Sequence, residues 1–342
     1  MRSRTRKVLH ICTGLLVLFS LSARTPGYGQ DVSFSQYYAN PLYMNPAFAG
    51  TIGAPRLSLQ YRDQWHQFKD AYTSYTAAID LPVDLLQGGL GIYILNDAQA
   101  NKILNNFQLN LAYSVRVQLD RDLFAHAGVQ LGYAENSLKT GELIFADNLD
   151  YNGGIPGTSA ESFEETKRSY LDYGMGLLLY SKKVFGGLAV HHLTEPDLSF
   201  SEDNPTDSKL PRKYTIHAGA RLPVFRHGHL RKKFDISPQI IFQKQGISDQ
   251  INYGLFATKS GLTGGAWFRQ NFGLRYDAMI LVVGFVNYKF QLTYSYDWTI
   301  SKLAGHTGGT SEISLAFVLN KRKQANRLLP FFEPYRERYG TP

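Results

Sequence analysis

Apolar and polar residues alternate almost without interruption in six stretches of this 342-residue chain. In residues 107–119 every odd position, from Phe107 to Leu119, is apolar, and every even position is small or polar. The same pattern recurs at 289–298, 57–61, 214–222, 234–242 and 313–319. Because successive side chains of a β-strand point to opposite faces, this alternation predicts strands with one apolar face.

The chain contains fourteen strand candidates in all. Their approximate limits are 56–63, 72–80, 89–95, 105–119, 122–134, 169–180, 183–193, 211–222, 233–243, 249–258, 262–270, 275–286, 289–299 and 311–320. Several of them reach ten to thirteen residues, whereas strands of globular proteins average about five or six. The length of the strands therefore favours a membrane-spanning barrel over a soluble β-sandwich, whose strands also alternate.

The connections between these strands differ in length in a regular way. Tight turns at 120–121, 181–182, 259–261 and 287–288 follow even-numbered strands, and long loops at 134–168, 194–210 and 299–310 follow odd-numbered strands. The even-numbered connections 81–88 and 223–232 are longer turns. Outer-membrane barrels have short periplasmic turns and long external loops. The sequence therefore predicts an all-β fold, an antiparallel transmembrane β-barrel of about fourteen strands over residues 56–320, with an N-terminal periplasmic segment.

Residues 1–29 have the composition of a secretory signal peptide. Basic residues between Arg2 and Lys7 precede an apolar stretch at 8–21 that is too short for a membrane helix, and we expect cleavage near Gly29. The single cysteine, Cys12, lies in this segment, so neither disulfides nor thiol catalysis are expected in the mature chain. Cleavage would also remove five basic residues and lower the formal net charge from +8 to +3. No basic helix or basic-aromatic module indicates nucleic-acid binding.

Residues 30–55 differ from the rest of the mature chain. They are rich in aromatic residues, and the pairs Asn40-Pro41 and Asn45-Pro46 exclude a regular helix or a central strand. The segment is too apolar to remain in solvent. We therefore expect it to pack in the mouth of the barrel or against its periplasmic rim, as a plug or a periplasmic cap. Residues 321–342 follow the final strand and are predicted to form a periplasmic tail.

Three groups of residues could carry metal chemistry, and each has a simpler explanation. His191 and His192 are adjacent, so on a regular strand they would point to opposite faces, and they are interpreted as a strand end. His227 and His229 lie in a basic sequence typical of a solvated turn. Residues 147–154 are rich in oxygen ligands for calcium, but their spacing does not match an EF-hand and favours a polar loop.

An outer-membrane hydrolase is a further possibility. It would require His191 or His126 beside a serine at the barrel rim, and the sequence has no Gly-x-Ser-x-Gly motif. Phosphate-binding and dinucleotide-binding motifs are also missing from the sequence. We therefore predict no enzyme activity and no catalytic, cofactor-binding or metal residues.

Several segments of the chain carry a family resemblance. The run from Phe34 to Gly50 resembles the PorP/SprF family of the type IX secretion system. Agreement continues in Tyr61-Arg62-Asp63-Gln64-Trp65, in His191-His192-Leu193 with Pro196, in Ser295-Tyr296-Asp297 and in 309–315, where Ser311 replaces an expected histidine. The resemblance extends from Phe34 to about Asn320. It implies an outer-membrane barrel of Bacteroidota that serves the secretion machinery at large, or that supports export or attachment of one large adhesin, including adhesins used in gliding. It implies no catalytic residues.

The resemblance implies a non-enzymatic outer-membrane component of type IX secretion that supports export or surface attachment of a secreted protein such as a large adhesin. The expected partners are that adhesin or its C-terminal signal domain, periplasmic secretion components and outer-membrane lipid. The alternative function is a passive channel for small solutes. We expect partner contacts in the N-terminal segment and in a basic periplasmic turn. The candidate residues are Phe34, Gln36, Tyr37, Asn40, Pro41, Asn45, Pro46, Arg226, Arg231, Lys232 and Lys233.

Overall fold

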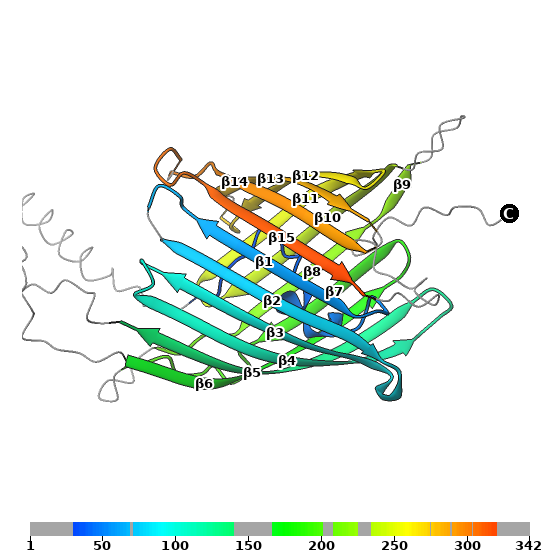
Figure 1. Cartoon of the computed structure of the whole chain (residues 1–342), viewed down its shortest axis with the longest axis horizontal. Helices are drawn as coiled ribbons and strands as arrows, with labels where there is room; N and C mark the ends of the chain where they lie inside the picture. The colour runs from blue at the N-terminus through cyan, green and yellow to red at the C-terminus, as the bar shows by residue number, and fades with distance from the viewer. Residues whose placement is uncertain are drawn as a thin grey trace, which may run out of the picture.

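The computed structural model describes residues 30–68, 71–139, 166–200, 208–224, 234–273, 275–287, 289–302 and 304–319. These residues form a closed antiparallel β-barrel of fourteen strands, with residues 30–55 inside it (Figure 1). The predicted signal peptide, the predicted basic turn at 226–233 and the predicted C-terminal tail lie outside the described residues, so these predictions stay untested.

The wall of the barrel is built from fifteen strand segments. They are β1 (Arg56–Gln64), β2 (Tyr72–Val83), β3 (Gly88–Gln99), β4 (Leu104–Gln118), β5 (Phe124–Leu138), β6 (Thr166–Tyr180), β7 (Val184–His191), β8 (Lys213–Ala220), β9 (Leu222–Val224), β10 (Phe234–Gln245), β11 (Ser248–Lys259), β12 (Leu262–Gln270), β13 (Tyr276–Val286), β14 (Phe290–Thr299) and β15 (Thr310–Val318). Short helical turns are α2 (Pro41–Met44), η1 (Pro46–Phe48) and η2 (Asp84–Leu86).

Each strand pairs with its neighbours in antiparallel fashion, and β1 closes the barrel against β15. In that seam Arg56 lies opposite Val318 and Gln64 lies opposite Thr310. The segments β8 and β9 both pair with β10 and form a single wall strand that is interrupted at Arg221. The Arg221 guanidinium forms an ion pair of 2.7 Å with Asp235 on β10. The predicted strand at 211–222 is therefore present, with a break near the end that pairs with the beginning of β10.

Polar side chains face the interior of the barrel, and apolar side chains face outward. On β1, Ser58 and Arg62 are 3% exposed, whereas Leu59 and Tyr61 are 39% and 36% exposed. This is the reverse of a soluble protein, which buries its apolar face. An apolar band around a polar interior is the arrangement of a transmembrane barrel. The alternation in the sequence thus marked an outer apolar surface, and the soluble sandwich is excluded.

The connections that the sequence predicted as tight and those that it predicted as long lie at opposite ends of the barrel, and a further short turn, 246–247 between β10 and β11, lies at the end of the long ones. The turns 181–183, 260–261 and 287–289 lie at the end where β1 begins, and the connections 192–212 and 300–309 lie at the other end. Because outer-membrane barrels have short periplasmic turns, we refer to these as the periplasmic end and the outer end. The strand β2 extends to Val83. The connection between β2 and β3 is therefore shorter than the range 81–88 expected from the sequence. Among the described residues, no helix is long and apolar enough to cross a membrane.

Candidate functional site

Residues 30–55 pass through the interior of the barrel from the outer end to the periplasmic end (Figure 1). Asp31 contacts the outer ends of the wall strands through Lys213 of β8. Near the periplasmic end, the Gly50 N–H donates to Asp80 of β2 at 3.0 Å. Almost every residue between Phe34 and Ala54 is buried. The segment therefore lies deeper than the mouth or rim position expected from the sequence, because the inward strand faces supply partners along its whole length.

The two Asn-Pro pairs divide this segment into short turns. Pro41 begins α2, and Pro46 begins η1, where the fixed φ of proline suits the first position of a helical turn. The Asn45 side chain accepts a hydrogen bond of 2.9 Å from the Ala47 N–H and caps η1. These turns fold the chain tightly enough to fit within the barrel.

Gln36 lies fully buried at the centre of a hydrogen-bonded cluster. Its N–H donates to a Glu312 carboxylate oxygen at 2.8 Å. Its side-chain amide donates to Ser295 Oγ, and its side-chain oxygen accepts from Thr293 and Ser314. Since both ends of the carboxamide are bonded to the wall, β14 and β15 fix the segment at this point.

Four buried charged side chains surround Ser35 and Gln36. Arg62 of β1 pairs with Glu312 of β15, and Arg269 of β12 pairs with Asp297 of β14 at 3.0 Å. The Ser35 hydroxyl donates to Asp297 Oδ2, and the Ser35 N–H donates to Glu312 at 2.6 Å. Two arginines and two carboxylates balance in charge, so the cluster tolerates burial and links the segment to four strands.

A second charged cluster holds the outer end of the segment. His192 lies between the carboxylates of Asp31, at 2.8 Å, and Asp172, at 3.0 Å. Lys213 lies 3.3 Å from Asp31 and 4.6 Å from the ring centroid of Tyr43, which belongs to the segment. Burial alone lowers the pKa of His192, but the two carboxylates outweigh burial and raise that pKa to about 9. The protonated His192 therefore links β6 to the N-terminal segment.

The backbone at His192 explains why both adjacent histidines face inward. The strand β7 ends at His191, as the sequence indicated, and His192 has a φ of 57°. This left-handed conformation departs from strand geometry, so both residues are buried, at 4% exposed each. His192 thereby joins the charged cluster, a role that the alternation pattern did not predict.

Inward-facing glycines leave room for the backbone of the segment. A Cβ added at Gly128 of β5 would lie 2.4 Å from the Ala47 nitrogen, and one added at Gly176 of β6 would lie 1.9 Å from Asn45 Oδ1. The Asn45 amide also donates to the carbonyl oxygens of Leu177 and Leu188 at 3.1 Å. The wall is therefore shaped to accept this segment.

The candidate partner-binding residues of the segment contact the barrel itself. Phe34 packs edge-on against Tyr43 with the ring centroids 5.4 Å apart, and the Tyr37 hydroxyl donates to Gln239 at 2.7 Å. Tyr37 is partly buried. The other six candidates in the segment are buried: Phe34, Gln36, Asn40, Pro41, Asn45 and Pro46. While the segment occupies the lumen they cannot reach a partner. The other candidates, Arg226, Arg231, Lys232 and Lys233, lie outside the described residues, as do His227, His229 and residues 147–154.

His126 is buried on the inward face of β5, two residues from the periplasmic end of that strand. Its ring nitrogens are 3.4 Å from Ser114 Oγ and 3.3 Å from the Tyr180 hydroxyl. Ser114 is fully buried and donates to the Ala49 carbonyl at 2.7 Å. This differs from the hydrolase arrangement, in which a carboxylate orients the histidine and the serine is accessible. Within the described part of the chain, no group of three or more His, Cys, Asp or Glu residues is placed to hold a metal ion.

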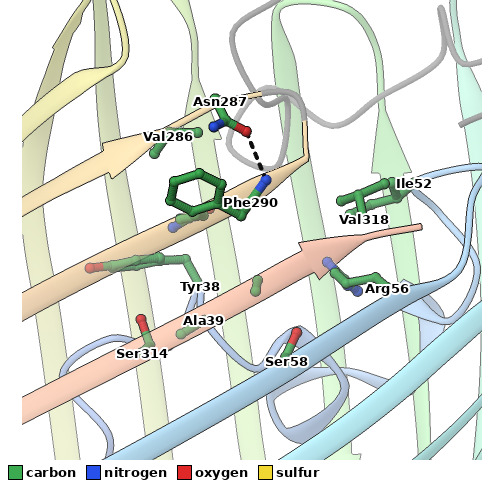
Figure 2. Close-up of a pocket in the computed structure, with 12 residues that line it drawn as sticks. Tyr38, Ala39, Ile52, Arg56, Ser58, Val286, Asn287, Phe290, Ser314 and Val318 are labelled. Atoms are coloured by element: carbon green, nitrogen blue, oxygen red, sulfur yellow. Dashed lines mark hydrogen bonds between the residues drawn. The ribbon is translucent and has the colours of Figure 1, made fainter. Parts of the chain in front are cut away.

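Open spaces of different size lie between the segment and the barrel wall. Near the outer end, a cavity of about 480 Å³ lies beside Asp31, Trp65 and Asp97. Near the periplasmic end a pocket of about 20 Å³ lies between the segment and strands β1, β13, β14 and β15 (Figure 2). Tyr38 and Ile52 of the segment border it together with Phe290, whose N–H donates to Asn287 Oδ1 at 2.8 Å (Figure 2). A space of this size holds about one water molecule.

The sequence segments that carry the family resemblance meet around the N-terminal segment. Arg62, Asp297 and Glu312 come from three of those segments and bind Ser35 or Gln36 from a fourth. His192 comes from another and binds Asp31. Sequence reasoning missed these charged residues as a site. The signal that could have found them is the presence of arginine and carboxylates within the short matching segments.

The family described as "Type IX secretion system membrane protein PorP/SprF" matches residues 27–317. No curated protein matches the chain. Solved barrels are similar at low identity. The KdgM porin in complex with disordered oligogalacturonate is 8% identical, with 78% of this chain and 99% of that chain covered and a TM-score of 0.37. Omp33 of Acinetobacter baumannii is 6% identical, with 78% of this chain and 97% of that chain covered and a TM-score of 0.42. A FadL homologue of Pseudomonas aeruginosa is 12% identical, with 81% of this chain and 93% of that chain covered and a TM-score of 0.40.

Proposed function

Because the chain belongs to the PorP/SprF family of type IX secretion membrane proteins, we propose that this outer-membrane barrel supports export or surface attachment of a secreted protein. A large adhesin, including one used in gliding, is the expected client, and the host is a bacterium of the Bacteroidota. The protein acts by binding: it holds the client or its C-terminal signal domain and contacts periplasmic secretion components.

The observation that carries this proposal is the filled lumen. Residues 30–55 bind the inward faces of strands around the barrel, with Gln36 and its neighbours buried at the centre. A barrel of fourteen strands has more interior room than its wall side chains alone fill. Here a dedicated segment of the same chain fills much of that room. This supports a binding role over the alternative, a passive channel for small solutes.

Affinity purification tests the proposal. The tagged protein is isolated from detergent-solubilised outer membranes of its own organism, and co-purified proteins are identified by mass spectrometry. A large surface protein or periplasmic secretion components should be enriched relative to an unrelated tagged barrel from the same membranes. Recovery of the barrel without such partners, together with solute conductance by the pure protein, would replace the binding role with the channel.

A further inference from the structure

The cavity at the outer end has an acidic and aromatic lining. It holds about 480 Å³ and is bordered by the carboxylates Asp31 and Asp97 and by the rings of Trp65, Tyr72 and Tyr170. None of the described residues that line it is a lysine or an arginine. Aliphatic side chains, among them Leu104, complete the wall. A positively charged ligand with an apolar stem matches this combination of surfaces.

Asp97 of β3 is a buried carboxylate whose charge is not balanced within the described structure. It is 3% exposed, and it accepts hydrogen bonds from the Ser74 hydroxyl at 2.6 Å and from the Gln99 amide at 2.7 Å. Both donors are neutral, and no cationic side chain of the described residues forms an ion pair with Asp97. Asp31 differs, since His192 and Lys213 balance its charge. A buried carboxylate gains stability from a cation that provides a charge-assisted hydrogen bond.

Asn136 gives an independent reason to regard the cavity as a ligand site, and Trp65 supplies an aromatic wall. The indole packs edge-on against Tyr72 with the centroids 5.2 Å apart and borders the cavity. Asn136, 7% exposed, also lines the cavity, and its side-chain oxygen has no hydrogen-bond partner among the described residues.

We propose that this outer-end cavity is a binding site for a lysine or arginine side chain of the exported polypeptide. The carboxylate of Asp97 receives the cationic group, the rings of Trp65, Tyr72 and Tyr170 face the charge, and the aliphatic wall packs against the methylene stem. The inference deepens the proposed function and rests on it, because it names the chemistry by which the barrel recognises its client.

Calorimetric titration of the purified mature protein in detergent tests the site, with tetralysine as the probe. The comparison probes are tetralysine acetylated at every Nε and the neutral sugar maltotriose. Tetralysine should bind, and its affinity should fall at least ten-fold in Asp97→Asn. The same charge change in Asp120→Asn, at an exposed turn of the periplasmic end, should leave binding unchanged. Trp65→Leu, which keeps both carboxylates, should also weaken binding if Asp97→Asn does not fold.

Equal binding of acetylated and free tetralysine, an equal loss in Asp120→Asn, or a preference for maltotriose would overturn the site. Affinity purification of wild type and Asp97→Asn from native membranes then distinguishes failure of the proposed cavity site from failure of the proposed function. If both proteins recover the same client in equal amounts, the cavity is not the recognition site although the barrel binds a client. If wild type recovers no client, the proposed function itself fails.

Discussion

Glu312 joins the N-terminal segment to the seam that closes the barrel. Its carboxylate accepts from the N–H groups of Ser35 and Gln36 and pairs with Arg62, which lies directly opposite on β1. The side chain is fully buried. The same residue therefore stabilises both the closure of the wall and the position of the segment.

Glu312→Gln should strongly destabilise the protein. The change removes the main partner of Arg62 and leaves it with Asp297, which also pairs with Arg269. Breaking a buried ion pair costs about 3–5 kcal/mol. Urea unfolding in detergent micelles measures the loss. Glu195→Gln is the matched control, because its pair with Arg212 is 39–46% exposed and such pairs contribute about 0–1 kcal/mol. Equal stability of the two variants would contradict the role of the buried cluster.

The cluster around His192 should make stability fall in alkaline solution. Since the pKa of His192 is raised to about 9 in the folded protein from an ordinary value of 6.5, its contribution is complete below about pH 6.5 and is lost as the pH rises through 9. The groups that face it are Asp31, Asp172, Lys213 and His191. Thermal midpoints of wild type and His192→Gln, measured from pH 6 to 10.5, should converge at high pH. A constant difference would refute the charged state of His192.

The element that determines the state of the lumen is the segment at 30–55. Deletion of residues 31–50 should remove most of the material that fills the barrel and should raise the conductance of the protein in planar bilayers. Heat-dependent gel migration checks that the deleted protein is folded. Conductance identical to that of wild type would show that the segment does not block the lumen.

A single substitution offers a milder test of the same element. Gly128→Ala places a Cβ against the backbone of η1, and overpacking of this kind costs about 1–3 kcal/mol. We expect faster proteolysis within 30–55. Gly264→Ala, on the outer face of β12 where an added Cβ would meet no atom closer than 4.0 Å, should be cut at the wild-type rate.

The strands could be predicted from the sequence because their signal is local. Alternation of period two marks both the strand and its apolar face, so all fourteen wall strands were expected within a few residues of their limits. The buried cluster could not be predicted in this way, because Arg62 and Glu312 are 250 positions apart. Their contact depends on the register of the closing seam. The entry of residues 30–55 into the lumen also depends on closure, which creates the partners of Gln36.

At the scale of the whole molecule, the two ends of the barrel have different expected partners. The outer end carries the acidic cavity, and the basic turn at 226–233 is a candidate for periplasmic contacts. Charge reversal of Arg226, Arg231, Lys232 and Lys233 should reduce recovery of periplasmic secretion components in affinity purification. Reversal of Lys182 and Lys183, at another turn of the same end, is the control. An unchanged set of partners would remove the basic turn from the proposed interface.

The most direct test of the central claim is the surface proteome of the organism with and without this protein. Surface proteins are released from intact cells by brief proteolysis and quantified, and the periplasm is analysed in parallel. We predict that deletion of the gene depletes one large secreted protein, or a set of them, from the surface, and that wild-type protein on a plasmid restores them. An unchanged surface proteome, with impaired uptake of a small solute as the defect, would contradict the account.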